Sequence, residues 1–232
     1  MEYIDFHSHV LPGIDDGSKD PQMSAQMLKT LYSQGVRHSV LSSHFYGRRH
    51  SPEEYLKIRQ EAFDRLMTVY EPDRMPILHL GAEVALSQHM MKWELSGMKL
   101  DGTNIIMLEL PGRYEDWIDD IMYEFSVTGY KIMIAHLDRV IDSYPKQKWM
   151  KLLDKNFIYQ INNDSLSSMK IRKTIEKLAK EGADFVLGSD AHNITDRSPN
   201  FDEATTRLKK GGLSDEFADS IERNQGKILR LW

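Results

Sequence analysis

The stretch 4–17, IDFHSHVLPGIDDG, places two histidines (His7 and His9) and a pair of aspartates (Asp15 and Asp16) close together near the start of the chain. Burying such groups costs free energy unless a partner holds their charges. The stretch begins inside the apolar run Tyr3–Phe6, which has the length and composition of a buried strand. It therefore predicts a polar cluster at the carboxyl end of a strand, whose partners must come from elsewhere in the chain.

The composition narrows the class of protein. The chain has 232 residues, of which 41% are hydrophobic and 28% are charged, as is typical of globular domains. A net charge of -5 leaves no basic excess for binding nucleic acid. The chain has no cysteine, which excludes disulfides, thiol nucleophiles and thiolate metal sites. We find no signal peptide and no apolar stretch of about 20 residues that would insert into a membrane, so we expect a cytoplasmic protein.

Short apolar runs alternate along the chain with longer segments of helical periodicity. The seven runs are 3–6, 38–43, 77–82, 104–110, 131–135, 157–161 and 185–188. This alternation predicts parallel strands joined by crossover helices, and seven repeats favour a closed or nearly closed barrel over an open sheet. We therefore expect a single α/β domain over residues 1–232, with a helical tail from about residue 214.

Ligand-type side chains follow six of these runs. They are His7 and His9 after the first, with Asp16 in the loop beyond, then His44, Glu83, Glu109, His136, and finally Asp190 with His192. The carboxyl ends of parallel strands share one face of a barrel or sheet, so these residues should converge. Other histidines (His38, His50, His79 and His89) lie within runs, on helix faces or in loops, and we interpret them as structural or solvated.

Five imidazoles and four carboxylates form a ligand set for Mn²⁺, Fe²⁺, Zn²⁺ or Mg²⁺. Nine ligands exceed what one ion uses, so the set indicates two or three divalent ions per chain. Each residue alone has a simpler explanation: Glu83 or Glu109 could be an ordinary salt-bridge partner. Asn162, after the sixth run, could bind substrate, orient a ligand or belong to a turn.

The motifs DFHSHVLPGIDDG, SSHFY, GAE, LEL, IAHLDR and GSDAHN, in this order, resemble those of the polymerase and histidinol phosphatase (PHP) superfamily. Within it, the chain is similar to bacterial manganese-dependent protein-tyrosine phosphatases of capsule and exopolysaccharide operons. The resemblance implies a PHP fold, which is a distorted (β/α)7 TIM-like barrel, with a trinuclear site. It also implies three ligand sets: His7, His9, Glu83 and Asp190; then Glu83, Glu109 and His136; then Asp16, His44 and His192. Only the family pattern selects Asp16 over Asp15.

Two arginines, Arg139 and Arg197, match arginines that the family uses around the substrate phosphate. A guanidinium suits this role because it is permanently charged and binds phosphate in a bidentate manner. The alternative is that each arginine pairs with a neighbouring aspartate, Asp138 or Asp196. The chain departs from the family pattern where Leu137-Asp138-Arg139-Val140 replaces Pro-Glu-Arg-Tyr.

A second pair of arginines, Arg48 and Arg49, lies in the loop after His44. These two could attract an acidic phosphopeptide or simply be solvated.

These features predict a phosphate-monoester hydrolase, with phosphotyrosine on a partner protein as the expected substrate. The resemblance implies the C-terminal tail of a tyrosine kinase that controls polysaccharide synthesis. Arg139 and Arg197 would meet charge on the phosphate, and His136 or a water molecule would protonate the leaving oxygen. Three alternatives stay open: a histidinol-phosphate phosphatase, a non-catalytic metal-binding scaffold, and an exonuclease-like activity that the acidic balance disfavours.

Overall fold

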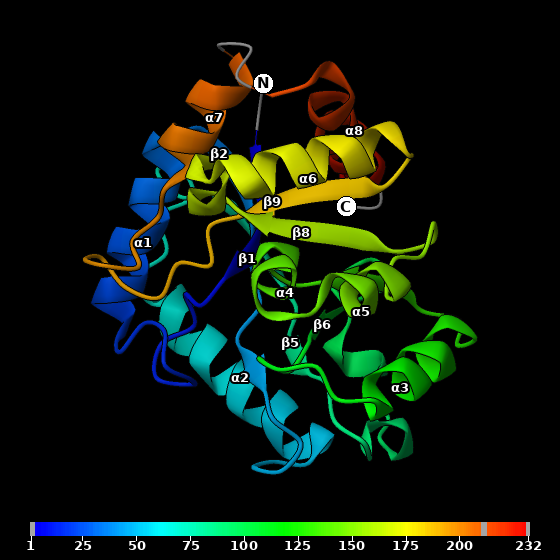
Figure 1. The fold of residues 1–232 in the computed structure, drawn as a ribbon. Coiled ribbons are helices and arrows are strands. Elements are labelled where there is room, and N and C mark those ends of the chain that lie inside the picture. The colour runs from blue at the N-terminus through cyan, green and yellow to red at the C-terminus, as the bar shows by residue number, and fades with distance from the viewer. Residues whose placement is uncertain (1–2, 210–212, 231–232) are drawn as a thin grey trace.

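The computed structural model describes residues 3–209 and 213–230, and its strands form two sheets (Figure 1). The smaller sheet has the order β1 (Tyr3–Ser8), β2 (Val36–Leu41) and β4 (Ile77–Leu80). The larger sheet consists of β3 (His44–Phe45), β5 (Glu83–Ala85), β6 (Ile105–Glu109), β7 (Lys131–Ile134), β8 (Ile158–Asn162) and β9 (Asp184–Gly188), in that order. Every ladder is parallel, as the alternation of strands and helices predicts.

Two of the seven expected strands are broken. The second continues from β2 into β3 and the third from β4 into β5, and each passes from the smaller sheet to the larger one. Backbone hydrogen bonds hold the breaks together, because Ser42 N donates to Ser8 O at 2.9 Å and Glu83 N donates to Ser42 O at 3.0 Å. If β2 with β3, and β4 with β5, are each counted as one bent strand, the described residues form the expected seven strands.

The two sheets meet again where the first and last strands end. An isolated parallel bridge joins Ser8 to Ala191, and Asp190 N donates to His7 O at 2.8 Å. Gly188 permits this approach because a Cβ there would lie 2.6 Å from the Cβ of His7. The architecture agrees with the distorted seven-stranded barrel, although no continuous ladder closes the ring within the described residues.

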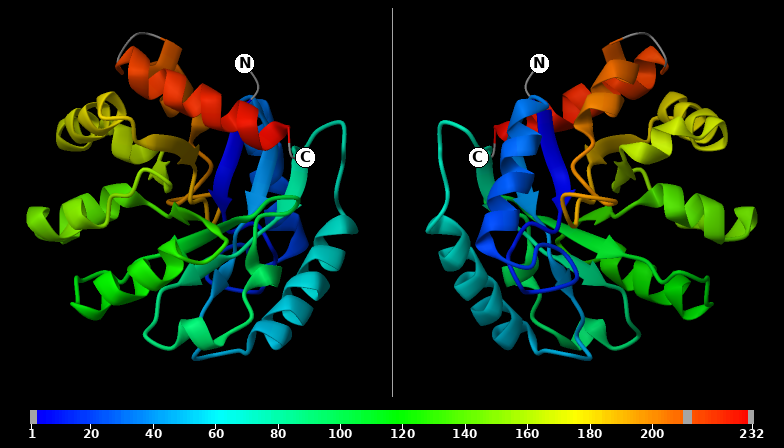
Figure 2. Two further views of the ribbon diagram at one scale, coloured as in Figure 1. Left: turned by 90° about the vertical axis from the view of Figure 1, so that its right-hand side faces the viewer. Right: turned by 90° about the vertical axis from the view of Figure 1, so that its left-hand side faces the viewer.

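Helices lie around the outside of the strands (Figure 2). They are α1 (Pro21–Ser33), α2 (Pro52–Met67), α3 (Trp117–Ser126), α4 (Leu137–Ser143), α5 (Lys146–Lys151), α6 (Met169–Lys180), α7 (Phe201–Lys209) and α8 (Asp215–Leu229), with short 3₁₀ turns η1 (Met90–Lys92), η2 (Ser96–Met98) and η3 (Asp164–Ser167). Two of these helices begin at capping residues: Asp20 accepts from Met23 N, and Ser51 forms a reciprocal capping box with Glu54. None of the described helices is long and apolar enough to cross a membrane.

The strands separate two apolar clusters. The larger one packs the strands against the surrounding helices. The smaller one gathers inward-facing side chains such as Phe6, Met107 and Val186, and it includes Ile228 of α8. Because Ile4 N also donates to Gln225 Oε1 of α8 at 2.8 Å, the C-terminal helix is attached at the amino-terminal side of the strands. The carboxyl-terminal edge is thereby left for polar residues.

Candidate metal centre

The nine predicted ligands meet at the carboxyl-terminal edge of the strands. Eight of them contribute donor atoms to three groups, and within each group these atoms all lie within 4.8 Å of one another. The groups are His9, Asp16, His44 and His192; His7, His9 and Asp190; and His44, Glu83 and Glu109. His136 stands beside the third group, with its Nε2 atom 2.7 Å from Glu83 Oε1 and 3.9 Å from Glu109 Oε1.

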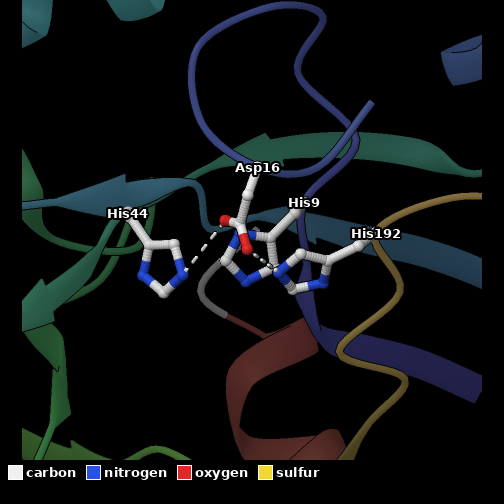
Figure 3. A group of neighbouring side chains, drawn as sticks. All are labelled: His9, Asp16, His44 and His192. Atoms are coloured by element: carbon white, nitrogen blue, oxygen red, sulfur yellow. Dashed lines mark ion pairs between the residues drawn. The ribbon is translucent and has the colours of Figure 1, made fainter. Parts of the chain in front are cut away.

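The first group joins the loop after β1 to β3 and to the segment after β9. Figure 3 shows the Asp16 carboxylate pointing into the space between three imidazole rings. Asp16 Oδ1 is 3.5 Å from His44 Nε2, and Asp16 Oδ2 is 3.6 Å from His192 Nε2. The His9 and His192 rings stack with centroids 3.9 Å apart.

The second group is fully enclosed. The Nε2 atoms of His7 and His9 are 3.1 Å apart, and they lie 3.6 and 3.4 Å from Asp190 Oδ1. Both nitrogens are also 3.3 Å from Glu83 Oε2. The four side chains that the family resemblance assigns to one ion therefore surround one point.

The third group differs in part from the expected set. His136 contacts Glu83 as expected, but His44 also reaches these carboxylates, with its Nδ1 atom 2.9 Å from Glu83 Oε2 and 3.6 Å from Glu109 Oε2. Since the other nitrogen of His44 faces Asp16, this ring stands between two groups.

The polar atoms of the centre fit divalent cations better than they fit one another. Four buried atoms have no hydrogen-bond partner among the described residues: His44 Nδ1, Glu83 Oε2, His136 Nδ1 and His192 Nε2. Two of them, His44 Nδ1 and Glu83 Oε2, are 2.9 Å apart without the geometry of a hydrogen bond. Buried polar atoms without partners cost free energy, and nitrogen and oxygen donors of this kind coordinate divalent ions.

The imidazoles and carboxylates of the centre shift one another's pKa values. Burial alone would raise the pKa of Glu83 and Asp190, but the surrounding imidazoles, His7 foremost, hold the pKa of both carboxylates well below the usual range. Conversely, the carboxylates overcome burial and raise the pKa of His7 and His9. Burial and the neighbouring Glu83 raise the pKa of Glu109 to about 7. Imidazolium protons thus balance the carboxylates, and a divalent cation takes the place of such protons when it binds.

Gln160 orients two of the histidines. Its Oε1 atom accepts from His136 N at 2.7 Å and lies 3.0 Å from His7 Nδ1, while its Nε2 atom donates to Asn162 Oδ1 at 2.9 Å. This role was not predicted from the sequence. The signal was present, because Gln160 is a polar residue inside the apolar run 157–161, where an amide needs partners.

The adjacent aspartates Asp15 and Asp16 occupy different environments. The Asp15 side chain is buried and lies 2.8 Å from His9 Nδ1, and it accepts from the backbone amide of His44 at 2.9 Å, so it orients the His9 ring and fixes the backbone that carries His44. The Asp16 side chain is 63% exposed and faces the imidazoles from the open side. The geometry thus separates two residues that the sequence leaves equivalent.

Two residues of the centre adopt backbone conformations that are unfavourable for side chains other than glycine. His136 has φ 31° and Asp190 has φ 50°, and no other non-glycine residue in the described ranges has a positive φ. Conformations of this kind cost on the order of 1–3 kcal/mol each and cluster at functional sites.

The predicted phosphate-binding arginines reach the centre from the solvent side. Nη2 of Arg139 pairs with Asp190 Oδ2, and Nη2 of Arg197 lies 3.1 Å from the same oxygen. Arg197 Nη1 is also 3.7 Å from Asp16 Oδ2. Their ion pairs therefore run to Asp190 and Asp16. The alternative pairing with Asp138 fails because Asp138 is buried, where it accepts from Asn162 N at 3.0 Å.

Other predicted substrate-binding residues divide into two kinds. Asn162 joins the centre, since its Nδ2 atom donates to Asp190 Oδ2 at 3.2 Å. Arg48 and Arg49 are exposed, with their guanidinium carbons 5.8 and 4.8 Å from the ring centroid of Tyr46. Arg48 also borders a cavity that Glu109 lines.

Comparison with known proteins agrees with this architecture. Residues 3–230 match the model of the family described as "Capsular polysaccharide synthesis, CpsB/CapC". Tyrosine-protein phosphatase YwqE of Bacillus subtilis is 27% identical over 238 residues, covering 98% of this chain and 91% of the relative. Tyrosine-protein phosphatase CpsB of Streptococcus pneumoniae is also 27% identical, covering 97% of this chain and 98% of the relative.

A solved structure shares the fold. It comes from work on YwqE of Bacillus subtilis and CpsB of Streptococcus pneumoniae, described as unique metal-dependent tyrosine phosphatases. It aligns with a TM-score of 0.72 at 23% identity, covering 92% of this chain and 89% of that one. Since the family model spans nearly the whole chain, this protein belongs to the CpsB/CapC family of capsular polysaccharide synthesis proteins.

Proposed function

We propose that this protein is a metal-dependent phosphoric monoester hydrolase that removes phosphate from tyrosine side chains of a partner protein. The observation that carries the proposal is the convergence of nine imidazole and carboxylate side chains with two guanidinium groups at one edge of the barrel. The names of the relatives, tyrosine-protein phosphatases, support the substrate. We further propose Mn²⁺ as the ion, two or three per chain, and the C-terminal tail of a tyrosine kinase as the cytoplasmic substrate.

The nine predicted side chains would hold the ions, with Glu83 shared between neighbouring groups. Divalent ions bound there would supply Lewis acidity toward phosphate oxygens and a water nucleophile activated near neutral pH.

Arg139 and Arg197 would bind the equatorial oxygens of the phosphate, and their permanent charge would stabilise the negative charge that develops there. Their side chains are 48% and 37% exposed, so an incoming phosphate can reach them from solvent. The absence of cysteine excludes a phosphocysteine intermediate.

His136 is better suited to be a ligand than a general acid. Burial lowers the pKa of His136 below its ordinary value, so its imidazole is neutral near pH 7 and keeps one nitrogen lone pair free to bind a cation. A phenolate is a good leaving group that needs little protonation, which favours tyrosyl over alkyl phosphates as substrates.

Turnover of a phosphotyrosine peptide and of histidinol phosphate, each with added Mn²⁺ and with a chelator, tests the proposal. We expect Mn²⁺-dependent hydrolysis of the peptide and a much lower kcat/KM for histidinol phosphate. Equal kcat/KM values on both would contradict the substrate, activity after complete metal removal would contradict the mechanism, and no turnover of either would favour a scaffold.

A further inference from the structure

A cavity of about 490 Å³ opens beside the metal centre. Its lining includes Tyr46, Arg48, Leu86, Trp93, Glu109 and Leu110. Glu109 belongs at once to this cavity and to the third ligand group. Tyr46 connects the two as well, because its ring stacks on His44 with centroids 4.9 Å apart. The cavity therefore begins where the candidate centre ends.

The walls of this cavity are mainly apolar and aromatic, and the indole of Trp93 is held firmly. The ring packs edge-on against Phe45, with centroids 5.6 Å apart and an interplanar angle of 80°. On another side, the backbone of Gly47 touches the indole so closely that a Cβ at this position would overlap the ring. A rigid indole of this kind provides contact area at low conformational cost.

The cavity also offers polar groups. Arg48 is exposed at its border, and the Glu109 carboxylate lines the end next to the metal centre. Apolar walls with a few polar groups, and a volume within about 300–1,000 Å³, are typical of sites for small organic groups.

We propose that this cavity binds the aromatic ring of a phosphotyrosine side chain and that Trp93 determines the preference for aryl over alkyl phosphates. The inference rests on the proposed phosphatase function. In a tyrosyl phosphate the ring is joined to phosphorus through the ester oxygen, so it must lie next to the centre that holds the phosphate. The cavity that shares Glu109 with this centre is within that reach, and its aromatic walls match a flat ring.

Binding of two phosphonates, whose carbon–phosphorus bond resists hydrolysis, tests the proposal without turnover. We would measure Kd for phenylphosphonate and methylphosphonate by calorimetry on the Mn²⁺-loaded protein. The wild type should bind phenylphosphonate about tenfold more tightly. Trp93→Ala should bring this ratio close to one while the Kd for methylphosphonate stays the same.

Matched variants separate the cavity from general damage. Trp117→Ala removes another half-buried tryptophan that packs on the same apolar cluster but does not line the cavity. Gly47→Ala pushes the indole away, whereas the Cβ of Gly112→Ala, at the same cavity, meets nothing within 4 Å. The aryl preference should vanish in Trp93→Ala and Gly47→Ala and persist in Trp117→Ala and Gly112→Ala.

A wild type without aryl preference, or a preference that survives both Trp93→Ala and Gly47→Ala, would overturn the proposal. If Trp93→Ala does not fold, the aryl preference of Gly47→Ala alone tests the proposal. A preference that follows this pattern in a protein without activity on phosphotyrosine would uphold the cavity and reject the proposed function. Turnover of phosphotyrosine without aryl preference in binding would uphold the proposed function and reject the cavity as the site of the ring.

Discussion

Two sets of histidines in this molecule show how neighbours decide what an imidazole does. At the carboxyl-terminal edge of the strands, carboxylates raise the pKa of both His7 and His9: Glu83 and Asp190 act on His7, and Asp15, Asp190 and Glu83 act on His9. In the smaller sheet, His38 of β2 and His79 of β4 face each other, with Nδ1 and Nε2 2.9 Å apart and the rings stacked at 5.2 Å.

For this pair the pKa shift is opposite to that of His7 and His9. Burial and the neighbouring His38 lower the pKa of His79 to about 4. An imidazole pair can share one neutral hydrogen bond, whereas a group of buried carboxylates requires positive charge. The carboxylates, more than the histidines, therefore make this edge suitable for binding cations.

The largest expected effect is on turnover. His136→Ala should lower kcat/KM for a phosphotyrosine peptide by about 10²–10³-fold, the range for removing one group that stabilises a transition state. His38→Ala, the matched change in the pair, should leave kcat/KM within about twofold. Steady-state assays at saturating Mn²⁺ measure both values. Comparable losses of kcat/KM in the two variants would contradict the difference between the two sets of histidines.

The next effect is on stability. Mn²⁺ at 100 times its Kd should stabilise the wild type by about 2.7 kcal/mol per site. For a domain of this size that raises Tm by roughly 5–10 °C. His38→Gln should show the same increment, whereas Glu83→Gln, which neutralises the shared carboxylate, should show a much smaller one. Scanning calorimetry with Mn²⁺ and with chelator measures these increments. An unchanged increment in Glu83→Gln would contradict the importance of the carboxylates.

A smaller effect separates the arginines from the ligands. Arg139→Ala should lower kcat/KM by about tenfold to a hundredfold while the metal content stays at the wild-type value, because a guanidinium contacts phosphate but no cation. Arg139→Lys should recover part of the loss. Kinetics and elemental analysis on the same preparations check this. A larger loss than that of His136→Ala would mean that the roles are misassigned.

The smallest expected effect is the pH dependence of stability that arises from the pair of His38 and His79. In the folded protein His79 takes up a proton only near pH 4, but in the unfolded chain it does so near its ordinary value of about 6.5. Acid therefore favours the unfolded state, and the wild type should lose on the order of 1 kcal/mol through His79 between pH 7 and pH 5. His79→Gln should lack this loss, and urea unfolding of both proteins at each pH measures the difference. Parallel losses would contradict the lowered pKa.

Position relative to strand ends allowed the sequence to separate the two sets of histidines. His38 and His79 lie within apolar runs, whereas His44 and His136 follow them, and parallel strands bring their ends together. Helix starts such as those at Asp20 and Ser51 can also be recognised from the sequence, because capping depends on residues that are close together in the chain. Local chemistry and the order of the strands are therefore enough to predict most of the fold.

Features that depend on register and on contacts distant in sequence could not be predicted. The breaks between β2 and β3 and between β4 and β5 leave no mark in the apolar pattern, because the runs 38–43 and 77–82 extend beyond the ends of β2 and β4. The different roles of Asp15 and Asp16 depend on which way the loop turns. The wall formed by Gly47 and Trp93 joins segments that are 46 positions apart, and no local pattern links them.

We expect donors from distant parts of the chain to hold several cations together at one edge of the barrel. Elemental analysis of the purified protein, as isolated and after reloading with Mn²⁺ and removal of free metal, tests it most directly. Two or three tightly bound ions per chain are expected. At most one ion per chain would contradict it.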